Sequence, residues 1–303
     1  MASRPNTRRM LLQSVAEVDS ALQRALLQAA RDAQRIVQSQ PGGIGEEVSQ
    51  AQILRILGEL RELSHRLWGS QIPEDVSRVI AMAEIRSRQG SDVLDQLMLT
   101  RLASPELRRD LVASIRQRAK RVVQVFETRQ RMARFELSER VYKWEYWHNG
   151  HVDSLVSSKF ALGASARDIA KAVRDFIDPN TAGGASYAAK RLGRTEVANA
   201  FHEQTRQDYA DNPFVPGLRW NLSGSHPRVD TCDDLAKGHS RGLPKGVYRT
   251  GEVPDKPHPQ CLCNVSPHTV DEVEFRKDFL DGGYNDFLMN KYPDIDPEDL
   301  PPY

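Results

Sequence analysis

The feature that most constrains the fold is a long stripe of apolar residues near the start of the chain. Apolar side chains recur there at intervals of three and four residues, at Leu11, Val15, Val18, Leu22, Leu26, Ala29, Ala33 and Ile36. This spacing puts them on one face of an α-helix, so we predict an amphipathic helix over residues 8–38. Pro41-Gly42-Gly43 is expected to end it.

The same pattern continues over the next hundred residues. A seam of apolar residues predicts a second helix over residues 45–68, with a break at Gly69 and Pro73. A third helix is predicted over residues 74–88, ended by Gln89-Gly90. Serine is a favoured N-cap, so Ser91 and Ser104 are candidates to begin further helices before residue 148.

Beyond the turn signal Asn149-Gly150 the pattern becomes shorter and more mixed. Helices are predicted over residues 164–176 and 186–209, followed by a strand over residues 218–222 and a loop-rich stretch to about residue 265. The expected fold class is therefore mainly α and α+β overall. We predict a helical arm or bundle over residues 1–149, a small α+β domain over 150–265, and an acidic C-terminal tail over 266–303.

Composition narrows the class of protein. Of 303 residues, 39% are apolar and 27% charged, and no segment approaches 18 uninterrupted apolar residues, so no membrane partner is expected. The basic segment Met1–Arg9 leads into a polar helix, which is not the pattern of a secretory signal. Residues 266–303 hold three basic and ten acidic residues, a net charge of −7, which is typical of a partner-facing or solvated terminus.

One predicted helical stretch, residues 108–134, is rich in basic residues. A solvated helix face is one interpretation, and contact with DNA or with an acidic partner surface is the other. The basic residues are Arg108, Arg109, Arg116, Arg118, Lys120, Arg121, Arg129, Arg131 and Arg134.

The three cysteines of the chain gather near its C-terminal end, at Cys232, Cys261 and Cys263, with His258 among them. An odd number cannot all pair within one chain, and Cys261 and Cys263 are too close in sequence to bridge without strain. Thiolate and imidazole are the ligands that structural zinc prefers. Cys232, His258, Cys261 and Cys263 are therefore a candidate Cys₃His set for a structural zinc ion, which would supply folding energy to a loop-rich segment.

The choice of ligands stays open at this stage. His226 and His239 are alternatives to His258, and the Cys-x₂-Cys spacing of ordinary zinc knuckles is absent because Leu235 stands at the second position. The competing interpretation is that the cysteines are free, buried small residues and that His258-Pro259 forms a turn.

The segment resembles a known family. Trp220 is followed by Asp230-x-Cys232-x₂-Leu235 and then by Pro257-His258-Pro259-x-Cys261-x-Cys263, with Arg194-Thr195-Glu196 on the preceding helix. This order and spacing is similar to the phage Mu F-type (MuF-like) minor head domain over about residues 150–265. Leu262 and Leu235 depart from the usual pattern, in which a basic or polar residue and often a further cysteine occur.

The resemblance implies a minor capsid protein that takes part in head morphogenesis of a tailed double-stranded DNA phage. It implies association with the portal protein, and with capsid or scaffold proteins and genomic DNA as further candidates. The expected location is the virion, in the capsid interior or at the portal vertex, after assembly in the host cytoplasm.

Two other functions remain open from the residues. One is a cytoplasmic zinc-binding adaptor whose helical half binds a partner helix. The other is a metal-dependent hydrolase or nuclease that uses Asp230, Asp233, Asp234 or His226 beside the metal. No His-Glu-x₂-His or other recognised hydrolase pattern occurs, and Glu196 beside Arg194 is expected to form a structural ion pair, so we expect no enzyme activity.

Overall fold

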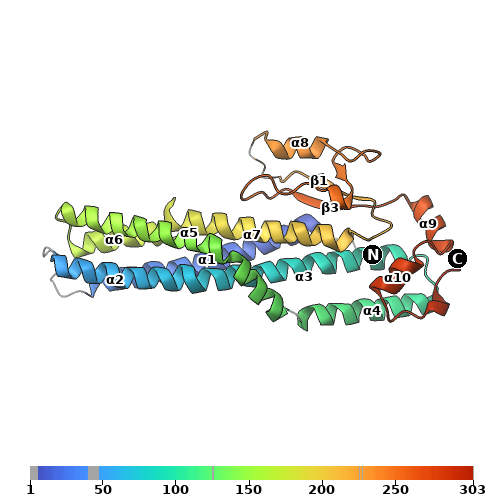
Figure 1. Cartoon of the computed structure of the whole chain (residues 1–303), viewed down its shortest axis with the longest axis horizontal. Coiled ribbons are helices and arrows are strands. Elements are labelled where there is room, and N and C mark those ends of the chain that lie inside the picture. The colour runs from blue at the N-terminus through green and yellow to red at the C-terminus, as the bar shows by residue number, and fades with distance from the viewer. Residues whose placement is uncertain (1–5, 40–47, 125, 225, 227, 303) are drawn as a thin grey trace. The chain divides into compact units, whose positions relative to one another are not determined.

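The computed structural model describes residues 6–39, 48–124, 126–224, 226 and 228–302. Helices dominate, and a small antiparallel sheet lies in the C-terminal region, which confirms the predicted fold class (Figure 1). The helices are α1 (Thr7–Gln38), α2 (Gln50–Arg66), α3 (Ile72–Leu99), α4 (Pro105–Gln124), α5 (Phe126–Ala161), α6 (Ala166–Ile177), α7 (Gly184–Tyr209), α8 (Thr231–Lys237), α9 (Glu272–Leu280) and α10 (Asn285–Lys291). The predicted stop at Pro41-Gly42-Gly43 lies outside the described residues.

The contacts of the chain group into two compact units. The first unit comprises Met1–Ser14, Ile80–Arg129 and Val197–Tyr303, and the second comprises Val15–Val79 and Gln130–Glu196. The boundaries between the units fall within α1, α3, α5 and α7. The three domains predicted from the sequence, over residues 1–149, 150–265 and 266–303, differ from this grouping of contacts. They stay a prediction about which segments fold independently.

The first unit contains the sheet. Strands β1 (Gly217–Asn221), β2 (Val247–Tyr248) and β3 (Asn264–His268) are ordered β2-β1-β3, and both pairings are antiparallel. The predicted strand over residues 218–222 is thus confirmed as β1. Short 3₁₀ turns, Thr250–Glu252 and Pro297–Asp299, occur in the connecting segments of the same unit.

The core of the first unit includes residues of the predicted acidic tail. Phe275, Phe279 and Tyr284 are buried, and Phe214 meets Phe275 and Tyr284 edge-on at ring distances of 5.4 and 5.6 Å. Leu288 of α10 is buried as well. The described part of residues 266–303 is therefore folded against the sheet region by its aromatic residues, although its net charge is negative.

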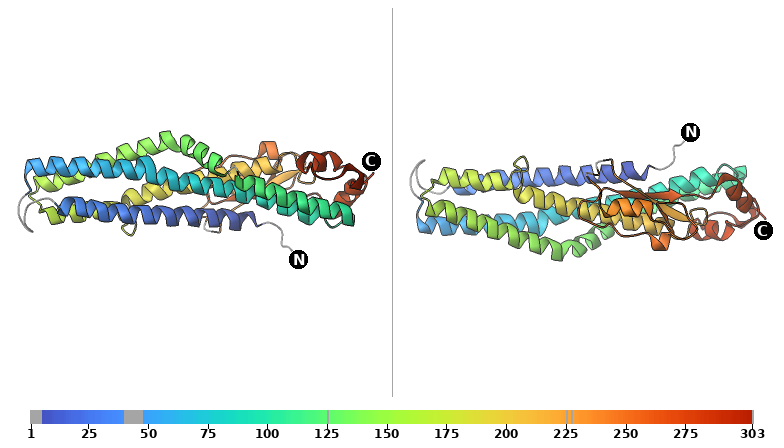
Figure 2. Two further views of the ribbon diagram at one scale, coloured as in Figure 1. Left: turned by 90° about the horizontal axis from the view of Figure 1, so that it is seen from below. Right: turned by 90° about the horizontal axis from the view of Figure 1, so that it is seen from above.

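The second unit is helical. Segments of α1, α2, α5, α6 and α7 lie lengthwise beside one another in Figures 1 and 2. The apolar stripe predicted for α1 is buried in this unit, and Val18, Leu22 and Leu26 are fully buried. Arg194 forms a bidentate ion pair with Asp19, and Glu196 pairs with Arg140, so both charged residues of Arg194-Thr195-Glu196 have structural partners.

Two predicted helix boundaries are wrong. α3 continues through Gly90. Ser87 and Ser91 donate hydrogen bonds to Asp208 of α7, and Leu94 is buried. These contacts outweigh the cost of a glycine within a helix, which is about 1 kcal/mol. α5 likewise continues through Asn149-Gly150. The predicted start at Ser104 is correct, since its hydroxyl accepts a hydrogen bond from the Leu107 amide at 3.1 Å.

The predicted turn at Asn149-Gly150 fails because the apolar face of α5 passes through it. His148, Val152 and Val156 are buried at helical spacing, and His148 lies against Trp68 with ring centroids 6.0 Å apart. Tertiary burial on one face of a helix outweighs a local turn preference.

Between α2 and α3 the backbone forms a π-helix, η1 (Leu67–Gln71), instead of the predicted break. Leu67, Trp68 and Ile72 are buried, whereas Gly69, Ser70 and Gln71 are exposed. The wider π turn accommodates one extra residue per turn between the two α-helical segments.

None of the helices in the described ranges combines the length and apolar character that a bilayer-spanning segment needs.

Candidate metal centre

The candidate centre is built from α8 and from the loop that leads into β3. Cys232 is the second residue of α8, whose N-cap is Asp230. The Asp230 carboxylate accepts a hydrogen bond from the Cys232 amide at 2.7 Å, and the Asp233 carboxylate accepts one from the Asp230 amide at 2.9 Å. This capping box fixes the turn on which the Cys232 thiol is carried.

His258 and Cys261 come from the loop before β3, and Cys263 directly precedes that strand. Gln260 adopts a left-handed backbone conformation (φ 58°), which turns the chain between His258 and Cys261. Because β3 pairs with β1, the sheet holds the C-terminal end of this loop in place.

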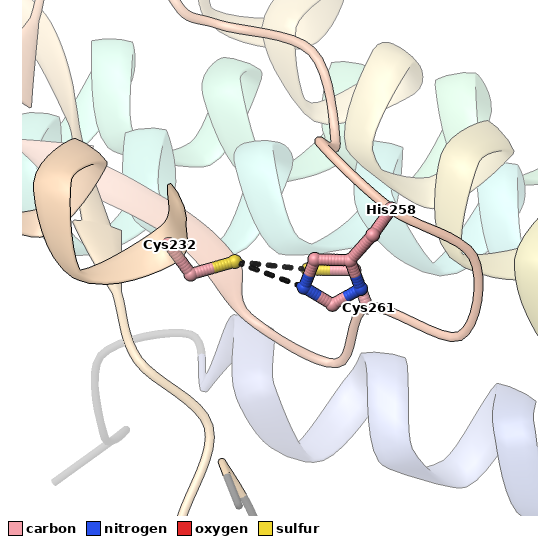
Figure 3. Close-up of side chains that lie close together, drawn as sticks. All are labelled: Cys232, His258 and Cys261. Carbon is pink, nitrogen blue, oxygen red and sulfur yellow. Dashed lines mark hydrogen bonds between the residues drawn. The ribbon is translucent and has the colours of Figure 1, made fainter. Parts of the chain in front are cut away.

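Three of the four predicted ligands form a compact group (Figure 3). The Cys232 Sγ lies 3.4 Å from His258 Nε2 and 3.6 Å from Cys261 Sγ. Tetrahedral zinc, with bonds of about 2.3 Å to sulfur and 2.0 Å to nitrogen, requires edges of about 3.8 Å between sulfurs and about 3.5 Å between sulfur and nitrogen. The observed distances match such a coordination polyhedron closely.

The other predicted candidates lie outside this group. Cys263 is buried, but its Sγ is not within 4.8 Å of all three ligand atoms of the group. His226 forms a second cluster with Asp230 and Asp233, and its Nε2 lies 2.8 Å from Asp233 Oδ2. The hydrogen bond to Asp233 raises the pKa of His226. His239 is exposed.

The hydrogen bonds around the group suit a metal centre. The His258 Nδ1 lies 3.1 Å from the Pro259 carbonyl oxygen, so that a proton on Nδ1 would donate to this oxygen and leave the Nε2 lone pair, on the side of Cys232, for a metal. The Ser223 amide donates to the Cys263 sulfur at 3.4 Å. Such outer contacts orient ligands and stabilise thiolate charge.

Lys256 supplies a positive charge beside the thiols. Its ammonium donates to the carbonyl oxygens of Cys261, at 3.1 Å, and Cys263. Burial lowers its pKa, and the negative groups that oppose this shift are the thiols of Cys261, Cys263 and Cys232. If Cys263 completed the set, a divalent ion with three thiolates and one neutral imidazole would carry one net negative charge, which the ammonium would neutralise. The donors of Cys232, His258 and Cys261 and their surroundings therefore fit a metal ion such as zinc.

The thiols differ in acidity. Burial raises the pKa of Cys232 to about 12, and a hydrogen bond with Cys261 raises the pKa of Cys263. The pKa of Cys261 is lowered, mainly by its hydrogen bond with Cys263 and further by the charge of Lys256. Cys261 is therefore the thiol that ionises most readily, and it lies next to the ammonium.

Sequence reasoning missed Lys256, Ser223 and the Pro259 carbonyl. The position of Lys256, two residues before His258 inside a cysteine-rich loop, was the signal that could have identified it. No signal marks the other two, because both act through the backbone.

Comparison of the chain with models of known protein families, with curated proteins and with solved structures finds no match.

Proposed function

We propose that this protein is a minor capsid protein of a tailed double-stranded DNA phage, with a structural zinc centre that holds its sheet region together. The observation that carries the proposal is the motif from Trp220 to Cys263. Its order and spacing resemble the MuF-like pattern, and two of its three cysteines, Cys232 and Cys261, lie together with His258. The proposal places the protein with the portal, in the capsid interior or at the portal vertex, where capsid, scaffold and DNA contacts are available.

The burial of the centre supports a structural role for the metal. Cys232, Cys261 and Cys263 are each at most 1% exposed, and only the His258 side chain reaches the surface, at 38%. A catalytic zinc keeps a coordination position open to substrate, whereas structural sites are closed by protein ligands. The proposal therefore includes no catalytic step.

One observation favours a hydrolase as a second candidate. Asp230 Oδ2 lies 3.3 Å from His258 Nε2, which places a carboxylate next to the metal position. The same carboxylate is engaged as the N-cap of α8, and Asp233 completes the capping box. These contacts support a structural use of both residues. Asp230→Asn that removes a metal-dependent hydrolytic activity would favour the second candidate.

Elemental analysis tests the metal. Protein that is purified under reducing conditions is expected to hold about one zinc ion per chain, and its absence would contradict the zinc centre.

Association tests the function. Mass spectrometry of purified virions is expected to detect the chain in low copy number, and co-expression with the neighbouring portal protein is expected to give a complex on sizing. If the chain is absent from virions and does not co-migrate with the portal, the zinc-binding adaptor becomes the better interpretation.

A further inference from the structure

A cationic cavity of about 360 Å³ lies in the first unit, away from the cysteines. It is lined by residues of α3, α4 and the segment from α10 onwards. The charged residues of its lining are Arg88, Arg118, Arg121, Lys291 and Asp294, so that cationic groups exceed carboxylates. Two of the arginines belong to the basic stretch that the sequence singled out.

Buried carboxylates fix two of these cations in position. Arg118 Nε donates to Asp92 Oδ1 at 3.2 Å, and Lys291 Nζ donates to Asp95 Oδ2 at 2.5 Å. Asp95 also accepts a hydrogen bond from the Tyr292 hydroxyl at 2.7 Å. A guanidinium has five N–H donors and an ammonium three, so these contacts anchor the cations and leave donors for a ligand.

The other two cations lie farther from their carboxylates and bond to neutral amides. Arg88 Nε lies 3.9 Å from Asp208 Oδ1, and its Nη2 donates to Gln204 Oε1 at 3.5 Å. Arg121 Nη2 lies 3.8 Å from Asp294 Oδ2 and, with the Gln117 amide in the orientation that satisfies its neighbours, donates to the Gln117 oxygen at 2.8 Å, which leaves its other N–H groups for a ligand. A second cavity, of about 650 Å³, shares Arg88, Arg118 and Lys291 and adds the carboxylates of Asp208 and Asp211. The excess of cationic over carboxylate side chains is therefore greater in the lining of the smaller cavity, with four against one, than in the larger, with three against two.

Ser114 gives independent evidence for a ligand. This residue of α4 is 3% exposed, lies in the wall of the smaller cavity, and its Oγ has no hydrogen-bond partner among the described residues. A buried hydroxyl without a partner is unfavourable, and a ligand oxygen in the cavity would satisfy it.

We propose that this cavity binds a phosphate group. Planar guanidinium groups match phosphate oxygens with paired hydrogen bonds, and a tetrahedral oxyanion has enough oxygens to reach donors on several sides. A carboxylate has only two oxygens and would leave more of these donors without a partner. The phosphate comes either from a free anion or from a nucleic-acid backbone, which share this chemistry. The proposal does not depend on the phage assignment or on zinc, since none of these residues belongs to the metal centre.

Calorimetric titration of the full chain tests the proposal. One titration uses inorganic phosphate at constant ionic strength, and a separate one uses a short DNA duplex. Saturable binding of one phosphate per chain is expected. Arg121→Gln is expected to weaken it roughly tenfold, because one charge-assisted hydrogen bond is lost. Ser114→Ala should weaken it several-fold without harming the fold, since the hydroxyl has no partner to lose.

Arg116→Gln is the matched control. Arg116 is an exposed residue of the same helix and does not line either cavity, so its loss changes net charge equally. If the DNA duplex binds, inorganic phosphate displaces it and Arg121→Gln weakens its binding, the phosphate comes from a nucleic-acid backbone. Binding of phosphate without DNA identifies a free anion. No saturable phosphate binding by the wild type, or equal loss in Arg116→Gln and Arg121→Gln, overturns the proposal.

Discussion

The two ring nitrogens of His258 face different partners, and this arrangement is what makes the cysteine group a credible metal centre. Nδ1 is engaged by the Pro259 carbonyl, which leaves Nε2 for the position shared with Cys232 and Cys261. The three groups come from two segments some 26 residues apart, so an ion there would cross-link α8 to the loop before β3.

The fourth ligand can be identified by mutation. Cys263→Ser is expected to lower zinc retention as strongly as Cys261→Ser, because Cys263 adjoins Lys256 and accepts the Ser223 amide. His226→Gln should leave zinc retention unchanged, since His226 is held by Asp233. The measurement is zinc release against a competing chromophoric chelator. Loss of zinc in His226→Gln alone would transfer the fourth position to that residue.

His148 should make stability depend on pH. Burial lowers its pKa to about 4, against 6.5 when unfolded, so the unfolded state binds more protons between these values. Stability is therefore fully present above pH 6.5 and falls as pH drops towards 4, by on the order of 3 kcal/mol. Urea unfolding from pH 4 to 7 should show a shallower pH dependence for His148→Gln, which can still bond to Ser64.

The matched control is His239→Gln, an exposed substitution expected to keep the wild-type pH dependence. An unchanged slope in His148→Gln would mean that other groups set the acid sensitivity.

The residues of the metal centre were only partly predictable. Cysteine and histidine are the common ligands of structural zinc, so the sequence alone made Cys232, His258 and Cys261 candidate metal ligands. The place of Cys263 and the part of Lys256 depend on how the loop folds around Gln260, and a left-handed glutamine leaves no signal in the sequence.

At the scale of elements, Gly193 of α7 lies at a close helix contact in the second unit. A Cβ atom there would approach Leu22 Cδ1 at 2.8 Å and Val18 Cγ2 at 2.9 Å. Gly193→Val is expected to destabilise the protein by about 1–3 kcal/mol through overpacking. Chemical denaturation followed by circular dichroism measures this change.

Gly58 of α2 provides the opposite case. It is exposed, and a Cβ atom there would meet nothing within 4 Å. Gly58→Ala is expected to stabilise the protein by up to about 1 kcal/mol, because alanine restricts the unfolded chain and favours the helix. A destabilised Gly58→Ala, or an unaffected Gly193→Val, would contradict the packing described for these helices.

Helices were easier to predict than their ends. The three-four spacing of Leu11 to Ile36 directly reports a buried face, and α1 follows it. Gly90 and Asn149-Gly150 are local turn signals, yet both lie within helices because Leu94, Val152 and Val156 continue a buried face. Such burial depends on partners distant in sequence, which local patterns do not contain.

At the scale of the whole molecule, each of the two units has buried apolar residues of its own. The first gathers Phe214, Trp220 and Phe279 around the sheet, whereas Leu22, Ile56 and Val156 are buried in the second. Damage to the metal centre should therefore be confined to the unit that contains it.

Cys261→Ser tests this confinement. Hydrogen exchange monitored by mass spectrometry is expected to show lost protection over residues 214–268, with α2 and α6 protected as in the wild type. Removal of zinc from the wild type by a chelator should reproduce the same pattern. Equal loss of protection in α2 and α6 would mean that the two units unfold together.

The π turn η1 bears on how the length of this chain can change. Buried apolar residues recur along α2 at Ile53, Ile56, Leu60 and Leu63, then in η1 at Leu67 and Trp68, and then in α3 at Ile72 and Val76. The five-residue step from Leu67 to Ile72 is one longer than an α-helical turn supplies, and η1 absorbs the difference. Loss of one exposed residue, such as Ser70, would restore ordinary helical phase between Leu67 and Ile72. Elsewhere in these helices a single deletion would rotate every later side chain by about 100° away from its partners. We therefore expect the chain to tolerate the loss of one residue within η1 better than the loss of one residue within α2 or α3.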